Sequence, residues 1–459
     1  MNKKYDIIIL GGGPGGYVSA VRAAQLGKKV AIVEKEQLGG ICLNWGCIPT
    51  KSLLKNAHVF EIIKNAKNYG IDIPSYSVNW PKIIQRSRNI AKRLNKGIEY
   101  LMKKNKVDHF SGFGSIIDKH TISITNDTKT QSLHAEFIII AAGTTQRNLS
   151  GLDIDGKLII SSREAMILNE IPKDIVIVGA GAIGVEFAHL FNTFGSNVTL
   201  VETMSSILPN EDADISKELT SIFSKRKINI LTNKKVEKVE KLKNSVKLLI
   251  DSKEIKTDIV LVAVGVTGNI NNIGLDKLSI KTDKGFIKAG AFMQTNVKNI
   301  YAIGDISGPP LLAHVASAEG ITAIEHICGL KPMEMRYDNI PACTYCEPEV
   351  ASVGLTEKEA KDSGYDIKIG KFPFRALGKS LADGNHDGFV KIIYDSKYGE
   401  LLGCHIIGHE ASNLISEIGL ARTLETTYHE VLKTIHPHPT LSEAISEATA
   451  DALNEAIHI

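Results

Sequence analysis

The chain has 459 residues, which at about 150 residues per domain predicts roughly three domains. Its 54 Lys and Arg against 51 Asp and Glu leave a formal charge of +3, so no large positive field is available to hold a nucleic acid. The composition, 43% hydrophobic and 23% charged, is that of a folded protein, and the longest apolar runs are far shorter than the roughly 18 to 20 residues of a membrane span.

The first predicted element is a strand at 5–10, followed by a glycine turn at 11–16 and a helix. Pro14 suits the first position of this helix, and Gly27 suits the residue just past its end. Gly11 allows the tight turn, Gly13 lets a pyrophosphate approach the backbone, and Gly16 lets the helix pack closely on the strand. Glu34 ends the next strand, 23 residues after Gly11, where a carboxylate can hold ribose hydroxyls. This context favours a dinucleotide site over a glycine turn without a ligand.

Cys42 and Cys47 come next, and their spacing does not suit a regular helix. Residues five apart in a helix point about 140° away from each other, so the two sulfurs could not meet. We therefore expect Cys42 in a loop, Gly46 at a bend, and Cys47 at the start of a helix, where a thiolate is stabilised. A disulfide that closes so small a ring would stabilise the fold little, so we expect it to serve redox chemistry. The alternative interpretation is that both residues are buried cysteines that pack as small apolar side chains.

A polar helix is predicted at 80–105, a strand-rich stretch at 108–125 and a buried strand at 137–143. The strand, turn, helix and strand pattern then returns at 175–202, with Gly179, Gly181 and Gly184 in the turn. Glu202 again lies 23 residues after the first glycine, and no Arg follows it in 203–206. A carboxylate there repels a 2′-phosphate, so this site should prefer NAD to NADP; the alternative is a solvated acid at a strand end.

Beyond residue 337, alternating segments such as 350–353 and 389–394 predict an antiparallel sheet with helices. Cys343 and Cys346 are expected on opposite faces of a strand as ordinary core or surface residues. No second pair with metal-ligand spacing accompanies them, so no metal site is predicted. The six cysteines are too few for a disulfide scaffold, which indicates a catalytic disulfide and a cytoplasmic location.

Near the C-terminus, His438 stands between Pro437 and Pro439 in the segment 436–443. Glu443 can fold back to orient the imidazole once a helix starts after Thr440, which gives a base with an orienting carboxylate. Thiol chemistry needs such a pair, although carboxylates that cap helices near histidines are also common.

Five motifs, at 11–16, 42–51, 179–186, 295–305 and 438–443, resemble in this order the pyridine nucleotide-disulfide oxidoreductases. Segments 39–51 and 436–443 resemble the branch of that family that oxidises dihydrolipoamide with NAD. The resemblance implies an α/β fold with two Rossmann-like dinucleotide-binding domains and a C-terminal α+β dimerisation (interface) domain. The implied boundaries are 1–147 for the FAD domain, 148–276 for the NAD domain, 277–338 for a central domain completing the FAD site, and 339–459 for the interface domain.

The same resemblance implies the role of each site residue. His438 takes a thiol proton from dihydrolipoamide, the substrate thiolate attacks Cys42 of the Cys42–Cys47 disulfide, and Cys47 is released beside the flavin, which passes hydride to NAD. Lys51 and Glu186 match the pair near the flavin N5, and Asp305 matches the acid that binds the ribityl chain. The implied FAD set is Gly11, Gly13, Gly16, Glu34, Lys51, Gly143 and Asp305, and the implied NAD set is Gly179, Gly181, Gly184, Glu186, Glu202 and Gly265.

Two positions depart from the family pattern: segment 265–269 lacks the Arg common in this loop, and Ala142 stands where Thr is usual before Gly143. The resemblance further implies a homodimer, a cis bond before Pro439, and as partners the lipoyl domains of a 2-oxo acid dehydrogenase complex or the H protein of glycine cleavage. Neither a nucleic-acid partner nor a membrane span is expected.

Other members of the family fit less well. Glutathione-type reductases need basic residues where this chain has Glu202, mercuric reductase adds a cysteine pair that 451–459 lacks, and a soluble transhydrogenase lacks the redox cysteines. From another class, a flavin-binding scaffold that docks to a larger complex stays open, and failure to reduce NAD with any dithiol would favour it.

Overall fold

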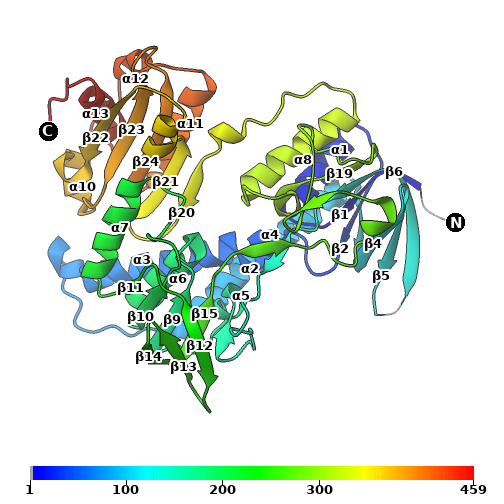
Figure 1. The fold of residues 1–459 in the computed structure, drawn as a ribbon, viewed down its shortest axis with the longest axis horizontal. Helices are drawn as coiled ribbons and strands as arrows, with labels where there is room; N and C mark the ends of the chain where they lie inside the picture. The colour runs from blue at the N-terminus through cyan, green and yellow to red at the C-terminus, as the bar shows by residue number, and fades with distance from the viewer. Residues whose placement is uncertain (1–3, 128) are drawn as a thin grey trace. The chain divides into compact units, whose positions relative to one another are not determined.

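The computed structural model describes residues 4–127 and 129–459, and its contacts divide the chain into two compact units (Figure 1). The first unit contains Met1–Leu53, Asn79–Arg147 and Gly265–Met335. The second contains Leu54–Val78, Asn148–Val264 and Arg336–Ile459.

The first unit is built on a seven-stranded sheet. Its parallel strands are β3 (Asp108–Ser111), β2 (Val30–Glu34), β1 (Lys4–Leu10), β6 (Thr130–Ile140) and β19 (Ile300–Ala302), and β5 (Thr121–Thr125) and β4 (Phe113–Asp118) extend it antiparallel. Ile7 and Ile9 pack into one core, and Ile8 and Leu10 pack into the core on the opposite face. Because both faces are covered, the strand is a continuous apolar run rather than an alternating one.

Helices α1 (Pro14–Gln25) and α8 (Ala313–Ile327) lie side by side in this unit (Figure 1). The predicted helix ends are confirmed, because Pro14 is the first residue of α1 and Gly27, with φ of 77°, follows its C-cap. The unit also contains α2 (Gly40–Trp45), the start of α3 (Cys47–Lys64), α4 (Trp80–Lys104), β7 (Thr144–Gln146), β16 (Val266–Gly268), β17 (Thr282–Asp283), β18 (Phe286–Ile287) and the 3-10 helices Asp276–Leu278 and Gly304–Ser307.

The second unit repeats the parallel design and adds an antiparallel sheet. Its parallel sheet has the order β11 (Asn229–Leu231), β10 (Asn197–Val201), β9 (Asp174–Val178), β15 (Ile259–Val262) and β8 (Ile159–Ile160). Helices α5 (Ser162–Ala165), α6 (Ala182–Thr193) and α7 (Ala213–Lys225) and the antiparallel strands β12 (Val236–Lys241), β13 (Val246–Ile250) and β14 (Lys253–Thr257) accompany it.

The C-terminal part of the second unit is the antiparallel sheet that the alternating segments predicted. Its order is β20 (Ala342–Thr344), β21 (Glu349–Gly354), β24 (Leu401–Gly408), β23 (Phe389–Asp395) and β22 (Ile367–Pro373). The accompanying helices are α9 (Glu357–Asp362), α10 (Gly378–Asp383), α11 (Ala411–Thr423), α12 (Tyr428–Lys433) and α13 (Glu443–Ala452).

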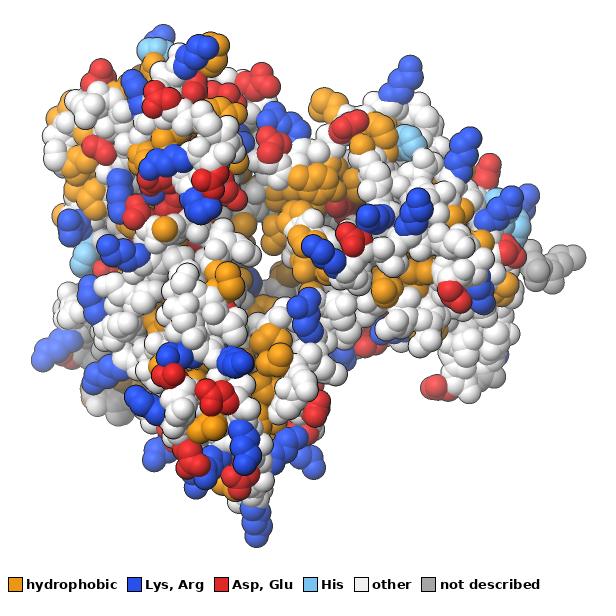
Figure 2. All heavy atoms as spheres, viewed as in Figure 1, with side chains coloured by type: hydrophobic (Ala, Val, Ile, Leu, Met, Phe, Trp, Pro, Cys, Tyr) orange, Lys and Arg blue, Asp and Glu red, His pale blue; other side chains and the backbone are white. Residues whose placement is uncertain are grey.

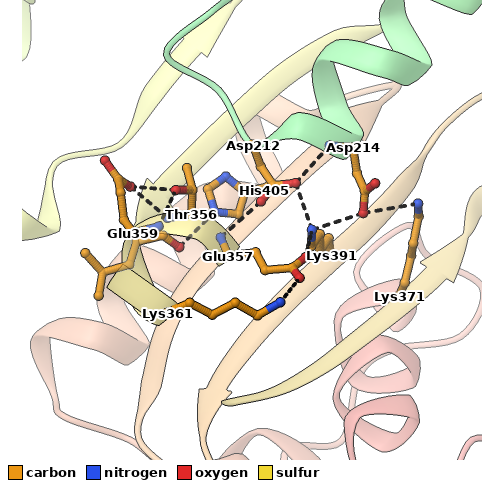
Figure 3. Close-up of polar contacts among 10 residues, drawn as sticks. Asp212, Asp214, Thr356, Glu357, Glu359, Lys361, Lys371, Lys391 and His405 are labelled. Atoms are coloured by element: carbon orange, nitrogen blue, oxygen red, sulfur yellow. Dashed lines mark hydrogen bonds and ion pairs between the residues drawn. The ribbon is translucent and has the colours of Figure 1, made fainter. Parts of the chain in front are cut away.

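A buried lysine joins this sheet to the N-terminus of α7 within the second unit (Figure 3). Lys391 is 2% exposed, and its Nζ donates to Asp212 Oδ1 at 2.8 Å, Asp214 Oδ2 at 3.0 Å and Glu357 Oε2 at 2.7 Å. Burial alone would lower the pKa of Lys391, but the three carboxylates raise it above its usual value. The charge is therefore fully compensated, which is the condition for burying it.

Two sequence expectations about cysteines are corrected. Cys42 lies in the short helix α2 rather than in a loop, because the helix stops at Gly46 and α3 starts afresh at Cys47. The break at Gly46 lets the two cysteines approach each other, which was the reason for expecting a loop. Cys346 lies beyond β20, which ends at Thr344, so the pair does not flank one strand; the buried Cys346 thiol donates to the Pro348 carbonyl instead.

On the face seen in Figure 2, acidic and basic side chains are interspersed, as the formal charge of +3 indicates. Across residues 4–127 and 129–459, no helix is both long enough and apolar enough to cross a membrane.

Candidate functional site

The first glycine turn is shaped by backbone contacts that admit no side chain. A Cβ on Gly11 would lie 2.1 Å from the Ala141 carbonyl oxygen, and one on Gly16 would lie 1.9 Å from the Gly11 carbonyl oxygen. Gly13, the N-cap of α1, has no atom within 4 Å of a Cβ position and no side chain that caps the helix. No side chain therefore caps the first turn of α1, which leaves its N–H groups available to a pyrophosphate.

The second glycine turn has the same construction. A Cβ on Gly179 would lie 2.4 Å from the Ala263 carbonyl oxygen, and one on Gly184 would lie 1.9 Å from the Gly179 carbonyl oxygen. Gly181 caps α6 with open space around it. Both turns therefore fit a dinucleotide in their own unit.

The acids that follow the two turns are also placed alike. Glu34 Oε2 accepts from Gly12 N–H at 2.7 Å, and Glu202 Oε2 accepts from Ala180 N–H at 2.7 Å. Each carboxylate holds its glycine turn and keeps lone pairs that a ribose hydroxyl can use.

The two cysteines of the redox motif lie together in the first unit. Their side chains are hydrogen-bonded, and this bond, followed by burial and the charge of Cys47, raises the pKa of Cys42 well above its usual value. Asn44 fixes the short helix α2 by donating from Nδ2 to the carbonyls of Leu38 and Gly40 at 3.0 and 2.9 Å. Cys47 is the sulfur at the start of a helix, where a thiolate is stabilised.

Two charged residues predicted for the flavin site act on Cys42. Lys51 lowers the pKa of Cys42 and Asp305 raises it, so both lie within electrostatic reach of its sulfur. Burial raises the pKa of Asp305 itself, while Thr144 Oγ1 donates to its carboxylate at 3.4 Å. Gly143, with φ of 66°, has open space around it.

The remaining predicted NAD residues are divided between the units. Glu186 is buried on α6, and its Oε1 accepts from Tyr345 N–H at 3.0 Å. Gly265 falls in the first unit, where its carbonyl accepts from Arg147 N–H at 3.0 Å. The pairing of Lys51 with Glu186 and the role of Gly265 therefore stay predictions.

His438 and Glu443 form the base pair expected from the sequence. The distance between His438 Nδ1 and Glu443 Oε1 is 2.8 Å, and Glu443 Oε2 accepts from Thr440 N–H at 2.8 Å. Burial opposes the ionised carboxylate, but the bonds from Thr440 and His438 hold the pKa of Glu443 below its usual value. The peptide bond before Pro439 is cis, as predicted. The imidazole is 78% exposed, which leaves Nε2 free to meet a thiol.

Sequence reasoning missed two side chains near these groups. Glu417 Oε1 lies 2.8 Å from Nε2 of His436, the other histidine of the proline segment, from a helix 19 residues earlier. Tyr17 follows Gly16 on α1, and burial together with the charge of Cys42 raises its pKa, so Tyr17 lies within electrostatic reach of Cys42. The position of Tyr17 next to the glycine turn was a usable signal, whereas no local pattern indicates Glu417.

A dithiol on one dinucleotide-binding unit, with a second glycine turn that fits another dinucleotide, defines a disulfide oxidoreductase. Residues 5–320 match the family model described as pyridine nucleotide-disulphide oxidoreductase, and residues 340–449 match the dimerisation domain of that family. The chain belongs to this family, which confirms the predicted fold class, the oxidoreductase class and the cofactors FAD and NAD.

Full-length relatives indicate which branch of the family this chain resembles. The dihydrolipoyl dehydrogenase of Zymomonas mobilis subsp. mobilis is 46% identical over 465 residues and that of Bacillus subtilis 45% identical over 473 residues, each match covering 100% of both chains. The crystal structure of LpdA from Mycobacterium tuberculosis has a TM-score of 0.92 at 26% identity and covers 97% of this chain and 99% of that one. These matches confirm the predicted resemblance to the dihydrolipoamide-oxidising branch.

Proposed function

We propose that this chain oxidises protein-bound dihydrolipoamide to lipoamide and reduces NAD+ to NADH. The observation that carries the proposal is the hydrogen-bonded pair Cys42 and Cys47, held beside Lys51 and Asp305 in the unit with the first glycine turn. The names of the full-length relatives support the choice of substrate.

The cofactors would be held by the residues that resemblance assigned to them. FAD would contact Gly11, Gly13, Gly16, Glu34, Lys51, Gly143 and Asp305, and NAD would contact Gly179, Gly181, Gly184, Glu186, Glu202 and Gly265. When bound, the flavin accepts the electron pair of the dithiol and NAD takes it as hydride.

The proton is handled by the pair at the C-terminus. Glu443 accepts from Nδ1 of His438, which leaves Nε2 as the atom that takes the proton of the substrate thiol. The substrate thiolate attacks Cys42 Sγ of the oxidised pair, a mixed disulfide forms, and Cys47 leaves as a thiolate. The second substrate thiolate then displaces Cys42, so the substrate is oxidised to its disulfide and the enzyme pair is reduced.

The assembly we propose is a homodimer in the cytoplasm whose partners are lipoyl domains of a 2-oxo acid dehydrogenase complex or the glycine cleavage H protein. The match of residues 340–449 to the family's dimerisation domain supports the homodimer. We also propose the four-domain division at 1–147, 148–276, 277–338 and 339–459.

The experiment is a spectrum followed by a turnover assay. The purified protein should carry bound flavin, and anaerobic dihydrolipoamide should produce long-wavelength absorbance from the Cys47 thiolate beside the flavin. Adding NAD+ should then yield one NADH per dithiol oxidised. Bound flavin without NADH formation from dihydrolipoamide would refute the proposed function and favour the scaffold alternative.

A further inference from the structure

Helix α4 concentrates positive charge to an extent that the whole chain does not. Between Trp80 and Lys104 it has eight Lys and Arg and one Glu, whereas the complete chain has a formal charge of +3. Like charges one turn apart destabilise a helix, so this run of cations lowers the stability of α4. A function of the run would explain its presence.

The inner face of α4 is fixed to the segment that contains the redox cysteines. Arg88 donates to the Asn44 carbonyl at 2.6 Å and stacks over the Trp45 ring, with its guanidinium 4.0 Å from the ring centroid. Ser87 Oγ donates to the Pro49 carbonyl at 3.0 Å. These contacts reach residues between the two cysteines and just after Cys47, so α4 packs directly on the redox segment within the first unit.

The outer face of α4 carries exposed cations. Lys82, Arg86, Arg93 and Lys96, which we call the basic face, are spaced 4, 7 and 3 residues apart and therefore lie on one side of the helix. A hollow of about 460 Å³ opens on this side, lined by Lys82, Gln85, Arg86, Asn89, Ile90 and Arg93. No carboxylate of the described chain pairs with Lys82, Arg93 or Lys96.

We propose that the basic face of α4 docks the acidic protein domain that carries the dithiol substrate. The inference rests on the proposed function and names the charge of its partner. A domain held on this face would bring a tethered dithiol to the segment that contains Cys42, and charge complementarity would speed its encounter with the enzyme.

A protein partner fits this face better than a nucleic acid. Arg86 of the basic face donates to Ser52 Oγ at 2.9 Å on α3, the helix that begins at Cys47, so an acidic occupant there would lie near the site where the dithiol reacts. Its hollow also combines cations with the Gln85 and Asn89 amides and the apolar Ile90, the mixture that protein interfaces use. The small overall charge of +3 offers no extended field for a polyanion.

The test compares tethered and free substrate on one charge-reversed holoenzyme. In the variant Lys82→Glu/Arg93→Glu/Lys96→Glu, kcat/KM for a purified lipoyl domain of net negative charge should fall about tenfold or more, as expected when steering charges are reversed. The value for free dihydrolipoamide should stay within about twofold, because this neutral substrate has no domain to dock. The wild-type rate with the domain should fall with added salt, and that of the variant should not.

A matched control carries the same change of charge elsewhere. Lys235, Lys238 and Lys243 are exposed around strand β12, and reversing these three to Glu should leave kcat/KM for the lipoyl domain within about twofold of wild type. The conservative variant Lys82→Arg/Arg93→Lys/Lys96→Arg should also keep it. With a lipoyl domain whose surface carboxylates are amidated, wild type and the reversed variant should have the same kcat/KM.

Several results would overturn docking. In the charge-reversed variant, an unchanged kcat/KM for the lipoyl domain or an equal loss of kcat/KM with free dihydrolipoamide would contradict it. A loss of kcat/KM seen only with the small anion dihydrolipoic acid, or dissociation of the dimer, would also do so. If the wild-type protein bound duplex DNA, the reversed variant did not, and both had the same kcat/KM for the lipoyl domain, the basic face would be assigned to nucleic acid. Failure of the proposed function is distinct, because wild type would then not oxidise free dihydrolipoamide.

Discussion

Glu34 and Glu202, 168 residues apart, accept the same hydrogen bond from the glycine turn of their own unit. Gly12 N–H donates to the first and Ala180 N–H to the second, both at 2.7 Å. The repeat extends to Gly16 and Gly184, because a Cβ added to either glycine would lie 1.9 Å from a carbonyl oxygen. The two units thus present one carboxylate each at the position where a ribose would lie.

The first prediction concerns the nucleotide. A carboxylate at Glu202 should disfavour the 2′-phosphate of NADP, since two like charges about 4 Å apart at an effective dielectric of about 20 repel by about 4 kcal/mol. We expect kcat/KM to be at least about 100-fold higher with NAD than with NADP. The variant Glu202→Gln, which keeps an oxygen acceptor for the turn but no charge, should narrow that ratio. Equal values for the two nucleotides in wild type would contradict the prediction.

The second prediction separates the roles of the two cysteines. Cys42→Ser should abolish dihydrolipoamide oxidation yet keep the long-wavelength absorbance, because the Cys47 thiolate remains beside the flavin. Cys47→Ser should lose both. Cys328→Ser is the control, since this cysteine at the end of α8 lies outside the redox segment, and it should keep wild-type activity. If Cys42→Ser lost the absorbance and Cys47→Ser kept it, the two roles would be reversed.

Local patterns were sufficient for the parts of the fold that depend on neighbouring residues. The apolar runs before Gly11 and Gly179 became β1 and β9, and Pro14 and Gly27 marked the ends of α1. His438 and Glu443 are five residues apart, so their contact could be predicted from one turn of chain.

Contacts between distant segments left no such pattern. Lys391 and Asp212 are 179 residues apart, and nothing near either residue shows that the lysine is buried with three acids. Glu417 reaches His436 from a different helix. Cys42 was placed in a loop because a single regular helix could not bring it to Cys47, but two helices broken at Gly46 satisfy the same geometry.

The third prediction concerns Lys391. Replacing it with Met leaves the buried Asp212 without its cation, and breaking a buried ion pair in this way costs about 3–5 kcal/mol. Lys361→Met is the control, because Lys361 also pairs with Glu357 but is 58% exposed, and an exposed pair is worth about 0–1 kcal/mol. Urea unfolding at pH 7 measures both. Equal losses of stability in the two variants would contradict the assigned role of burial.

The same cluster predicts how stability depends on pH. Burial opposes ionisation of Asp212, but Lys391 and backbone N–H groups lower its pKa, and Lys361 and Lys391 lower that of Glu357. Lowered carboxyl pKa values give stability that is complete above the ordinary values of 3.8 and 4.5 and is lost as pH falls below them. The difference in stability between wild type and Lys391→Met should therefore shrink below about pH 4.5. A difference that stays constant to pH 3 would contradict it.

The last prediction is that each active site combines groups from two subunits. Cys42 and Cys47 belong to the first unit, His438 and Glu443 to the second, and residues 340–449 match the family's dimerisation domain. The His438 ring is 78% exposed on its own chain, as a base that serves a partner would be. In a two-fold dimer this arrangement builds two identical sites, each with the cysteines of one chain and the histidine of the other.

Mixed dimers test the shared site. Cys47→Ser and His438→Gln subunits, each inactive alone, are co-expressed with different tags, and the doubly tagged dimers are purified. Such a dimer has one site with both lesions and one intact site, so it should regain about half of wild-type activity, or about a quarter in an unsorted mixture with random pairing. If both groups came from one chain, every site of a mixed dimer would carry one lesion. Verified mixed dimers without activity would then show that each subunit builds its site alone.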